Sequence, residues 1–459
     1  MVREMTRGNP LKLILGFCLP MLLGNIFQQL YSMVDTVIVG KCINLDALAA
    51  VGSTGSVSFL VIGFTTGITS GSCILPAQLF GAGDYSQMRR AVAHAVYLCV
   101  ITTVTVTALA VSLCYPLLKL MQTPDDVIGL AYDYIVVIFM GIGVTMAYNL
   151  MAGILRAMGD SKTPLYFLIL ASLINIGLDF LFIMAFNMGV AGAGWATVVS
   201  QGISAVLCFI YIRRSYPILR YEKEELKFSG KILGSIAKIG VAMGLQFSIT
   251  AVGSIILQGA VNGLGKVTMA AITAANKMQS LVIAPMETLG ITMATYAGQN
   301  LGAGNYRRIT QGMHRAYCVG MIYAVVAMVL VWVFSGSLCM LFINENEENS
   351  AQVIEQAVHF IRINGLFYLT LAYLFIVRNM LQGVGYSFLP MLAGAAELMA
   401  RTAVALGFVR RFGFEAVCFA SPIAWIAADL LLMTVYIVKM REIKRRTDEN
   451  GMIVRPANS

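Results

Sequence analysis

Eight ionisable side chains interrupt long apolar stretches of this sequence, and they are the residues whose types and positions could do chemistry. These are Asp35, Asp179, Lys277, Glu287, Arg362, Glu397, Arg401 and Asp429. If the apolar stretches cross a lipid bilayer, a charge at the bilayer centre costs about 2.5–3.5 kcal/mol on insertion scales. Ionisable residues retained at that cost are functional candidates by default.

Asp35 and Asp179 have neighbours that suggest a binding site. Asn175 precedes Asp179 by four residues, so the two share one helix face. Asn149 and Thr197 add further oxygen atoms in the same half of the chain. Carboxylate, amide and hydroxyl oxygens of this kind could hold a small cation such as Na⁺ or share a proton. The alternative is structural, with Asp35 at the outer interface and Asp179 satisfying a helix-packing hydrogen bond.

The remaining candidates lie in the C-terminal half and suggest structural or cavity-lining roles. Glu397 and Arg401 are four residues apart, which predicts an ion pair within one helix. Glu287 follows Pro285 by two residues and is expected to face a cavity or to pair with Lys277. Asp429 has no evident local partner, with Arg401 as the one candidate, and the amide Gln246 is a further residue expected in a cavity-lining or structural position.

The sequence contains no pattern that indicates an enzyme. The nine Cys residues are scattered without CxxC spacing, and the three His residues show no metal-ligand spacing. No nucleophile–base set is recognisable. We therefore expect neither catalysis nor a cofactor, apart from Na⁺ or H⁺ as a bound ion.

The elements that must position these residues are membrane helices. Hydrophobic residues make up 58% of the chain and charged residues 12%, about half the charged share of soluble proteins, and the mean hydropathy is +0.78. A net charge of +9 does not indicate nucleic-acid binding, because the basic residues sit in short breaks between apolar runs. Twelve spans of helical length are predicted: 11–39, 47–80, 88–115, 128–154, 164–186, 190–212, 231–258, 268–298, 308–337, 354–381, 387–409 and 416–440.

Basic residues between the spans predict the orientation of the chain. The side that carries both termini has 24 Lys and Arg residues, Arg378 among them, and the opposite side has 5. Because cytoplasmic loops carry the excess of positive charge, we expect both termini in the cytoplasm of a multi-pass protein in the cell membrane.

An internal repeat divides the chain into two halves. The segment 78–85 (QLFGAGDY) recurs as 299–306 (QNLGAGNY), and Leu155, Gly159, Ser161 and Pro164 recur 226 residues later. An even number of spans lies between the copies, which predicts parallel halves around a central cavity. The expected divisions are a six-helix lobe over 1–212, a cytoplasmic linker over 213–230, a six-helix lobe over 231–440 and a cytoplasmic tail over 441–459.

Taken together, these motifs resemble the multidrug and toxic compound extrusion (MATE) family of secondary transporters. The resemblance rests on the repeated GAGxY motifs, Pro20 with Asp35 in the first span, the segment 156–160 (RAMGD), and the segment 175–179 (NIGLD). It implies that Asp35 and Asp179 are coupling carboxylates, with Asn175 and Thr197 as further cation ligands and Asn149 nearby. Gln246 stands in the seventh span, where one branch of the family carries an acid, so the chain looks closer to the DinF-like branch.

The function that the resemblance implies is export of amphipathic, cationic organic compounds, driven by inward Na⁺ or H⁺. A lipid-linked saccharide flippase of the same wider superfamily is the alternative, but a pyrophosphate group would need several cationic residues. Only Lys277, Arg362 and Arg401 lie deep within the predicted spans, away from their ends. A receptor or channel fits the repeat and the buried acids less well. The expected partners are a small-molecule substrate and the lipid bilayer, with no nucleic acid, for a protein that acts as a monomer.

Overall fold

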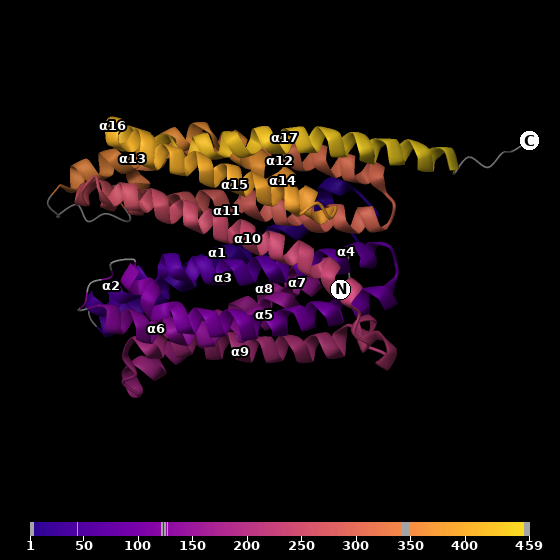
Figure 1. The fold of residues 1–459 in the computed structure, drawn as a ribbon, viewed down its shortest axis with the longest axis horizontal. Coiled ribbons are helices and arrows are strands. Elements are labelled where there is room, and N and C mark those ends of the chain that lie inside the picture. Colours follow the sequence, from indigo (N-terminus) through magenta and orange to yellow (C-terminus); the bar gives the residue numbers. More distant parts are fainter. Residues whose placement is uncertain are drawn as a thin grey trace, which may run out of the picture. The chain divides into compact units, whose positions relative to one another are not determined.

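A computed structural model describes residues 4–43, 45–120, 123, 125, 127–340 and 349–453, and all regular elements in that part of the chain are helical (Figure 1). The first half of the chain forms α1 (Pro10–Cys42), α2 (Leu45–Ser53), α3 (Gly55–Ser72), α4 (Ile74–Gly81), α5 (Tyr85–Leu120), α6 (Ile128–Met140), α7 (Ile142–Ala157), α8 (Lys162–Asp179), the π-helix η1 (Phe180–Ala185), α9 (Gly189–Ser215), and the 3₁₀-helices η2 (Pro217–Leu219) and η3 (Lys223–Leu226). The second half forms α10 (Gly230–Asn262), α11 (Lys266–Gly302), α12 (Tyr306–Cys339), α13 (Ser350–Leu366), α14 (Tyr368–Gly383), α15 (Phe388–Ala403), the π-helix η4 (Val404–Phe408), α16 (Val409–Phe412) and α17 (Phe414–Ile453).

The helices have the length and composition of membrane spans, which confirms the predicted all-α polytopic class. Within the described ranges nine helices pass as single spans, and the bent pairs α6–α7 and α13–α14 raise the number to eleven. The one remaining predicted span, 268–298, forms α11, a helix of 37 residues that does not pass as a membrane span by its composition.

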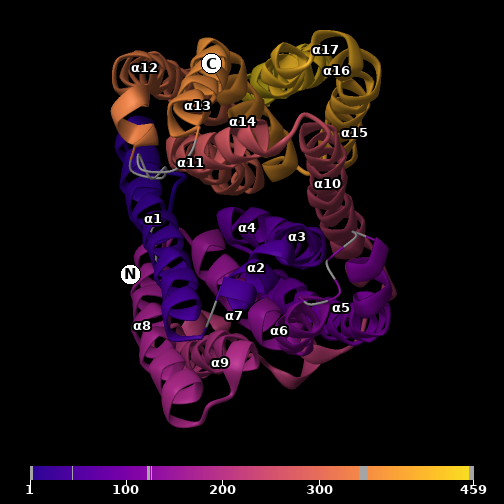
Figure 2. The same ribbon diagram turned by 90° about the vertical axis from the view of Figure 1, so that its left-hand side faces the viewer.

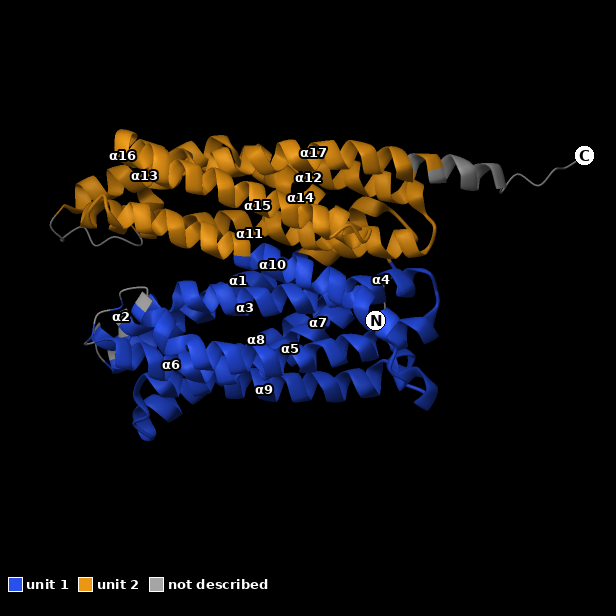
Figure 3. Ribbon diagram, viewed as in Figure 1, with its two compact units in different colours: residues 1–4, 19–248 blue, residues 5–18, 249–459 orange. Residues whose placement is uncertain are grey.

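The chain divides into two compact units (Figure 3). Unit 1 comprises residues 1–4 and 19–248, and unit 2 comprises residues 5–18 and 249–459. The division falls inside α1, beside Pro20, and inside α10, so the predicted linker 213–230 and the first part of α10 pack with unit 1. The last six residues of the predicted tail lie outside the described residues.

Unit 1 is built around α9, which packs against α6, α7 and α8, and Figure 2 shows α8 and α9 side by side. Glycines allow α3 to approach the first part of α10. A Cβ on Gly67 would lie 2.6 Å from the Cα of Gly244, and a Cβ on Gly71 would lie 2.7 Å from the Cα of Gly240. Pairs of glycines four residues apart on both helices therefore bring the two backbones into contact, as in other membrane helix pairs.

Unit 2 repeats the same order of elements, with α11 packed on α14 and α15 packed on α17. Its N-terminal arm (residues 5–8) docks on the second GAGxY motif. The backbone N–H of Met5 donates to Gln299 Oε1 over 2.8 Å, and Arg308 donates to the carbonyl oxygens of Met5 and Gly8 over 3.2 and 2.9 Å.

Irregular features of the backbone occur at matching positions in the two units, which supports the predicted duplication. The bend of 47° between α6 and α7 lies at Gly141, and the bend of 56° between α13 and α14 lies at Phe367, 226 residues later. Each unit also has a π-helix after the fifth span, namely η1 and η4. Three pairs of glycines with positive φ match as well: Gly83 with Gly304, Gly159 with Gly385, and Gly189 with Gly413.

Candidate functional site

The predicted acids Asp35 and Asp179 meet inside unit 1. Ile38 and Val39 of α1 pack in one apolar cluster with Ile183, which follows Asp179 in the chain, and this packing brings the end of α1 beside the end of α8. Asp35 is 8% exposed and Asp179 is fully buried, and the two carboxyl groups lie within hydrogen-bonding reach of each other. The structural alternative, in which Asp35 lies only at the outer membrane interface, therefore does not account for its contact with Asp179.

Two more predicted ligands, Asn175 and Thr197, complete the cluster. Asn175 is 1% exposed, and its Nδ2 donates to Thr197 Oγ1 on α9 over 3.5 Å, while that hydroxyl donates to the carbonyl of Ala193 over 3.1 Å. The amide oxygen of Asn175, Oδ1 of Asp35 and both carboxyl oxygens of Asp179 receive no N–H or hydroxyl hydrogen bond from the described residues.

These unsatisfied oxygens define what the cluster can do. Two carboxylates in contact cannot both stay ionised in an apolar environment without a counter-charge. No Lys or Arg forms an ion pair with either acid in the described part of the chain. A proton shared by the pair or a bound small cation would supply this counter-charge, and the amide and hydroxyl oxygens could act as additional ligands. We call Asp35, Asn175, Asp179 and Thr197 the acidic cluster.

Polar residues that the sequence argument missed surround the acidic cluster. Tyr31 of α1 interacts electrostatically with both acids and hydrogen-bonds with Gln28 and with Gln201 of α9. Gln201 also accepts a hydrogen bond from Thr145 over 2.7 Å. Tyr134 of α6 interacts electrostatically with the same two acids. Tyr31 lies four residues before Asp35 on the same helix face, and this spacing could have identified Tyr31 as a neighbour of the acidic cluster.

Other predicted candidates lie away from the acidic cluster. Asn149 is half-buried on α7 and has no recorded hydrogen bond with the four cluster residues, although Thr145 lies one turn before it. Gln246 is buried on α10. Lys277 is exposed on α11, and Glu287 is half-buried about 15 Å further along the same helix, given the rise of about 1.5 Å per residue. The suggested Lys277–Glu287 pair is therefore wrong, because the helix keeps the two side chains apart.

Unit 2 holds a buried ion pair that corrects the predicted position of Arg378. Glu397 of α15 is 3% exposed and pairs with Arg378 of α14, which is 6% exposed. Arg378 is therefore a buried partner of an acid and not a residue of a cytoplasmic loop. The predicted pair between Glu397 and Arg401 is present, but it is the longer contact, at 3.8 Å.

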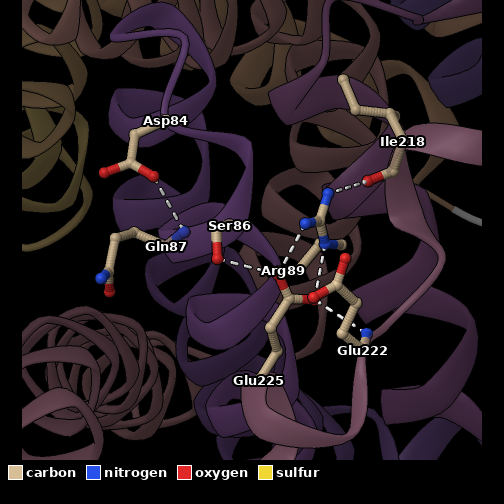
Figure 4. A network of polar contacts seen from close by, with 7 residues as sticks. All are labelled: Asp84, Ser86, Gln87, Arg89, Ile218, Glu222 and Glu225. Carbon is tan, nitrogen blue, oxygen red and sulfur yellow. Dashed lines mark hydrogen bonds and ion pairs between the residues drawn. The ribbon is translucent and has the colours of Figure 1, made fainter.

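The residues that follow the first GAGxY motif hold the segment that joins the two halves (Figure 4). Arg89 donates to Glu225 Oε2 and Oε1 over 2.6 Å each and to the carbonyl oxygen of Ile218 over 3.3 Å. Ser86 adds a hydrogen bond to Glu225 over 2.8 Å. The hydrogen bonds from Arg89 lower the pKa of Glu225 to about 2.

Asp160, in the loop before α8, closes the same end of unit 1. It accepts hydrogen bonds from the backbone N–H groups of Lys162 and Thr163 over 3.0 Å each, from the Thr163 hydroxyl, and from the hydroxyl of Tyr216. Burial raises the pKa of Asp160, but the hydrogen bonds from Thr163 and Tyr216 outweigh it and lower the pKa below its ordinary value.

A polytopic helical protein built from a duplicated unit, with an acid pair buried inside one copy, belongs to the class of membrane transporters. The family model named MatE matches residues 20–181 and 242–406, one segment in each half. This chain belongs to that family, the multidrug and toxic compound extrusion transporters, whose members are not enzymes.

Relatives and solved structures agree with this assignment. The chain is 30% identical over 346 residues, 74% of this chain and 76% of the relative, to "Probable multidrug resistance protein YpnP" of Bacillus subtilis. It is 25% identical over 411 residues, 87% of this chain and 86% of the relative, to "Probable multidrug resistance protein NorM" of Thermotoga maritima.

A solved structure described as "Outward-facing conformation of a multidrug resistance MATE family transporter of the MOP superfamily" matches the fold with a TM-score of 0.87 at 22% identity. The match covers 96% of this chain and 98% of that one. These similarities do not favour the lipid-linked saccharide flippase.

Proposed function

We propose that the chain is an antiporter that exports amphipathic organic cations in exchange for inward Na⁺ or H⁺, and that the acidic cluster couples the two movements. The observation that carries the proposal is the contact between Asp35 and Asp179 without a basic partner. Such a pair is stable when it holds one proton or one small cation.

The coupling follows from thermodynamic linkage. An ion can drive a cargo only if it binds the two conformations with different affinity. Asp35 and Asp179 come from two helices, α1 and α8, and Asp179 directly precedes the π-helix η1. Any change in the spacing between α1 and α8 alters the distance between the carboxyl groups, and with it the affinity of the cluster for a proton or Na⁺.

The proposal includes the setting of the protein. It acts as a monomer in the cell membrane with both termini in the cytoplasm, it uses no organic cofactor, and Na⁺, if it is the coupling ion, binds Asp35, Asn175, Asp179 and Thr197. The relatives named for multidrug resistance support the export of small molecules. The excess of basic residues on one side supports the orientation.

Transport by the purified protein in proteoliposomes tests the proposal. A fluorescent organic cation should accumulate under an imposed Na⁺ or pH gradient, and the gradient that drives it identifies the ion. Asp35→Asn and Asp179→Asn should each reduce this transport at least about tenfold, since a coupling energy of 1–3 kcal/mol corresponds to about 5–150-fold. Asp133→Asn, which changes an exposed acid on α6, is the matched control.

Two results would overturn the assignment. One is gradient-driven transport at the unaltered rate in both acidic-cluster variants. The other is movement of a lipid-linked saccharide by a protein that does not move the fluorescent cation.

A further inference from the structure

Unit 2 contains a second group of buried charges, on α14, α15 and α17. Arg378, Glu397 and Arg401 are 6%, 3% and 8% exposed, and Glu397 contacts both arginines. Asp429 of α17 interacts electrostatically with Arg378 and Glu397. Two basic and two acidic side chains therefore share a small apolar region of one unit. We call these four residues the charged quartet.

Asp429 is the member of the quartet that lacks a contact partner. It takes part in none of the ion pairs recorded for the described residues, and its buried Oδ1 has no hydrogen-bond donor there. The Nε atoms of Arg378 and Arg401 are also buried without an acceptor. The quartet is thus incompletely paired, with one acid oxygen and two arginine Nε atoms that have no hydrogen-bond partner among the described residues.

The other groups near Asp429 are phenols. Tyr317 of α12 and Tyr373 of α14 each interact electrostatically with Asp429, and both also interact with Tyr436 of α17. The rings of Tyr317 and Tyr373 are in edge contact, with centroids 5.6 Å apart. The charged or titratable groups that interact with Asp429 are therefore Tyr317 from α12, Tyr373 and Arg378 from α14, and Glu397 from α15.

We propose that Asp429 is a protonation site of unit 2 that binds and releases a proton during the transport cycle, independently of the acidic cluster. The inference rests on the proposed transport function. With Asp429 ionised the quartet has no net charge, and with Asp429 protonated its net charge is +1. A proton fits this place better than Na⁺ or an organic ammonium group, because a single carboxyl group that interacts with an arginine offers neither several oxygen ligands nor a favourable field for a second cation.

Proton binding at Asp429 changes the pairing of Arg378. When Asp429 is protonated, Arg378 is attracted to Glu397 alone, as in the pair described above. When Asp429 is ionised, the free Nε of Arg378 gains a second acceptor. This exchange links α14, α15 and α17 through a single side chain, so proton release favours a different packing of these three helices.

Infrared difference spectroscopy of the full-length protein in lipid vesicles tests the site directly. Spectra recorded at two pH values should contain the carbonyl stretch of a protonated carboxyl group that is lost in Asp429→Asn and shifted in Asp429→Glu. The same band should remain in Asp179→Asn. Unaltered carboxyl bands in Asp429→Asn would overturn the proposal, and if that variant does not fold, an unaltered spectrum of Asp429→Glu would do so.

Transport supplies the second measurement. Asp429→Asn should lower pH-gradient-driven transport of the fluorescent cation about tenfold, and Asp429→Glu should restore most of it. Transport by Asp429→Asn at the wild-type rate would refute a role of this proton in the cycle. If instead Asp35→Asn and Asp179→Asn transport normally, the proposed role of the acidic cluster fails, while the Asp429 band still decides this site on its own.

Discussion

At the scale of single residues, the buried carboxyl groups differ in which groups stabilise their negative charge. Asp35 and Asp179 face each other, whereas Glu397 has two arginines and Asp160 has a set of N–H and hydroxyl donors. The last two arrangements stabilise a fixed negative charge, which suits a structural role. Asp35 and Asp179 have neither arginines nor such donors among the described residues, and this difference separates the acidic cluster from Glu397 and Asp160.

The same argument gives a pH dependence for Glu225, which Arg89 holds ionised. Its pKa falls from an ordinary value of 4.5 to about 2 in the folded protein. A group with a lowered pKa stabilises the fold above its ordinary pKa, and this contribution is lost as pH falls from about 4.5 to about 2. We expect residues 217–229 to lose protection against hydrogen exchange, after correction for intrinsic rates, in that pH range.

Glu225→Gln should show the weaker protection already at neutral pH. Glu224→Gln is the matched control, since Glu224 is exposed and forms only a surface pair with Lys227. Protection of this segment that stays constant from pH 5 to about pH 2 would contradict the role assigned to Glu225.

At the scale of helices, the contact between α3 and α10 depends on glycine. Gly67→Ala would place a methyl group 2.6 Å from backbone atoms of Gly244, so the helices must separate. We expect a loss of about 1–3 kcal/mol, the usual cost of overpacking, and a lower Tm in detergent. Gly129→Ala on α6 has no atom within 4 Å of the added methyl group and should be neutral or slightly stabilising. Equal Tm values for the two variants would disprove the close contact.

The contact between α14 and α15 depends on the ion pair between Arg378 and Glu397. Arg378→Gln leaves Glu397 with only the long contact to Arg401 and should cost about 3–5 kcal/mol, as for other broken buried pairs. Glu397→Gln leaves both arginines without an acid in contact. The double variant Arg378→Gln/Glu397→Gln should be more stable than the sum of the single losses predicts, because the pair is removed together. Strict additivity in thermal unfolding would show that the pair does not form.

At the scale of the whole molecule, hydropathy predicted the number and order of the helices, and the repeated motifs predicted two related halves. Asn175 and Asp179 were predictable because spacing of four places them on one face of a helix. Arg378 was not, since a basic residue near the end of the predicted span 354–381 is typical of the cytoplasmic boundary, and only the structure shows that it is buried against Glu397. Tyr31 and Gln201 were missed because neutral polar residues carry little signal within a span. The bends at Gly141 and Phe367 leave no trace in hydropathy.

The duplication also predicts which exchanges between the halves are tolerated. Asp160 and Tyr216 in unit 1 correspond, 226 residues later, to Tyr386 and Glu442 in unit 2, so acid and phenol have changed places. Both pairs persist as hydrogen bonds, with Tyr386 donating to Glu442 over 3.4 Å. In unit 2, Lys439 also contacts the pair, at 4.2 Å from the Tyr386 ring centroid and 3.0 Å from the Glu442 carboxylate.

Transplanting the unit 1 arrangement into unit 2 should therefore succeed only as a pair. Tyr386→Asp alone places a second acid beside Glu442 and should lower the Tm, whereas Tyr386→Asp with Glu442→Tyr recreates an acid–phenol hydrogen bond. We expect a favourable coupling of about 0.5–3 kcal/mol in a double-mutant cycle measured by thermal unfolding.

The reciprocal exchange, Asp160→Tyr with Tyr216→Glu, should show no such rescue. Asp160 also accepts hydrogen bonds from the N–H groups of Lys162 and Thr163 at the start of α8, and a tyrosine cannot replace it there. Rescue in both units would mean that capping by Asp160 adds nothing, and rescue in neither would mean that the two pairs are not equivalent.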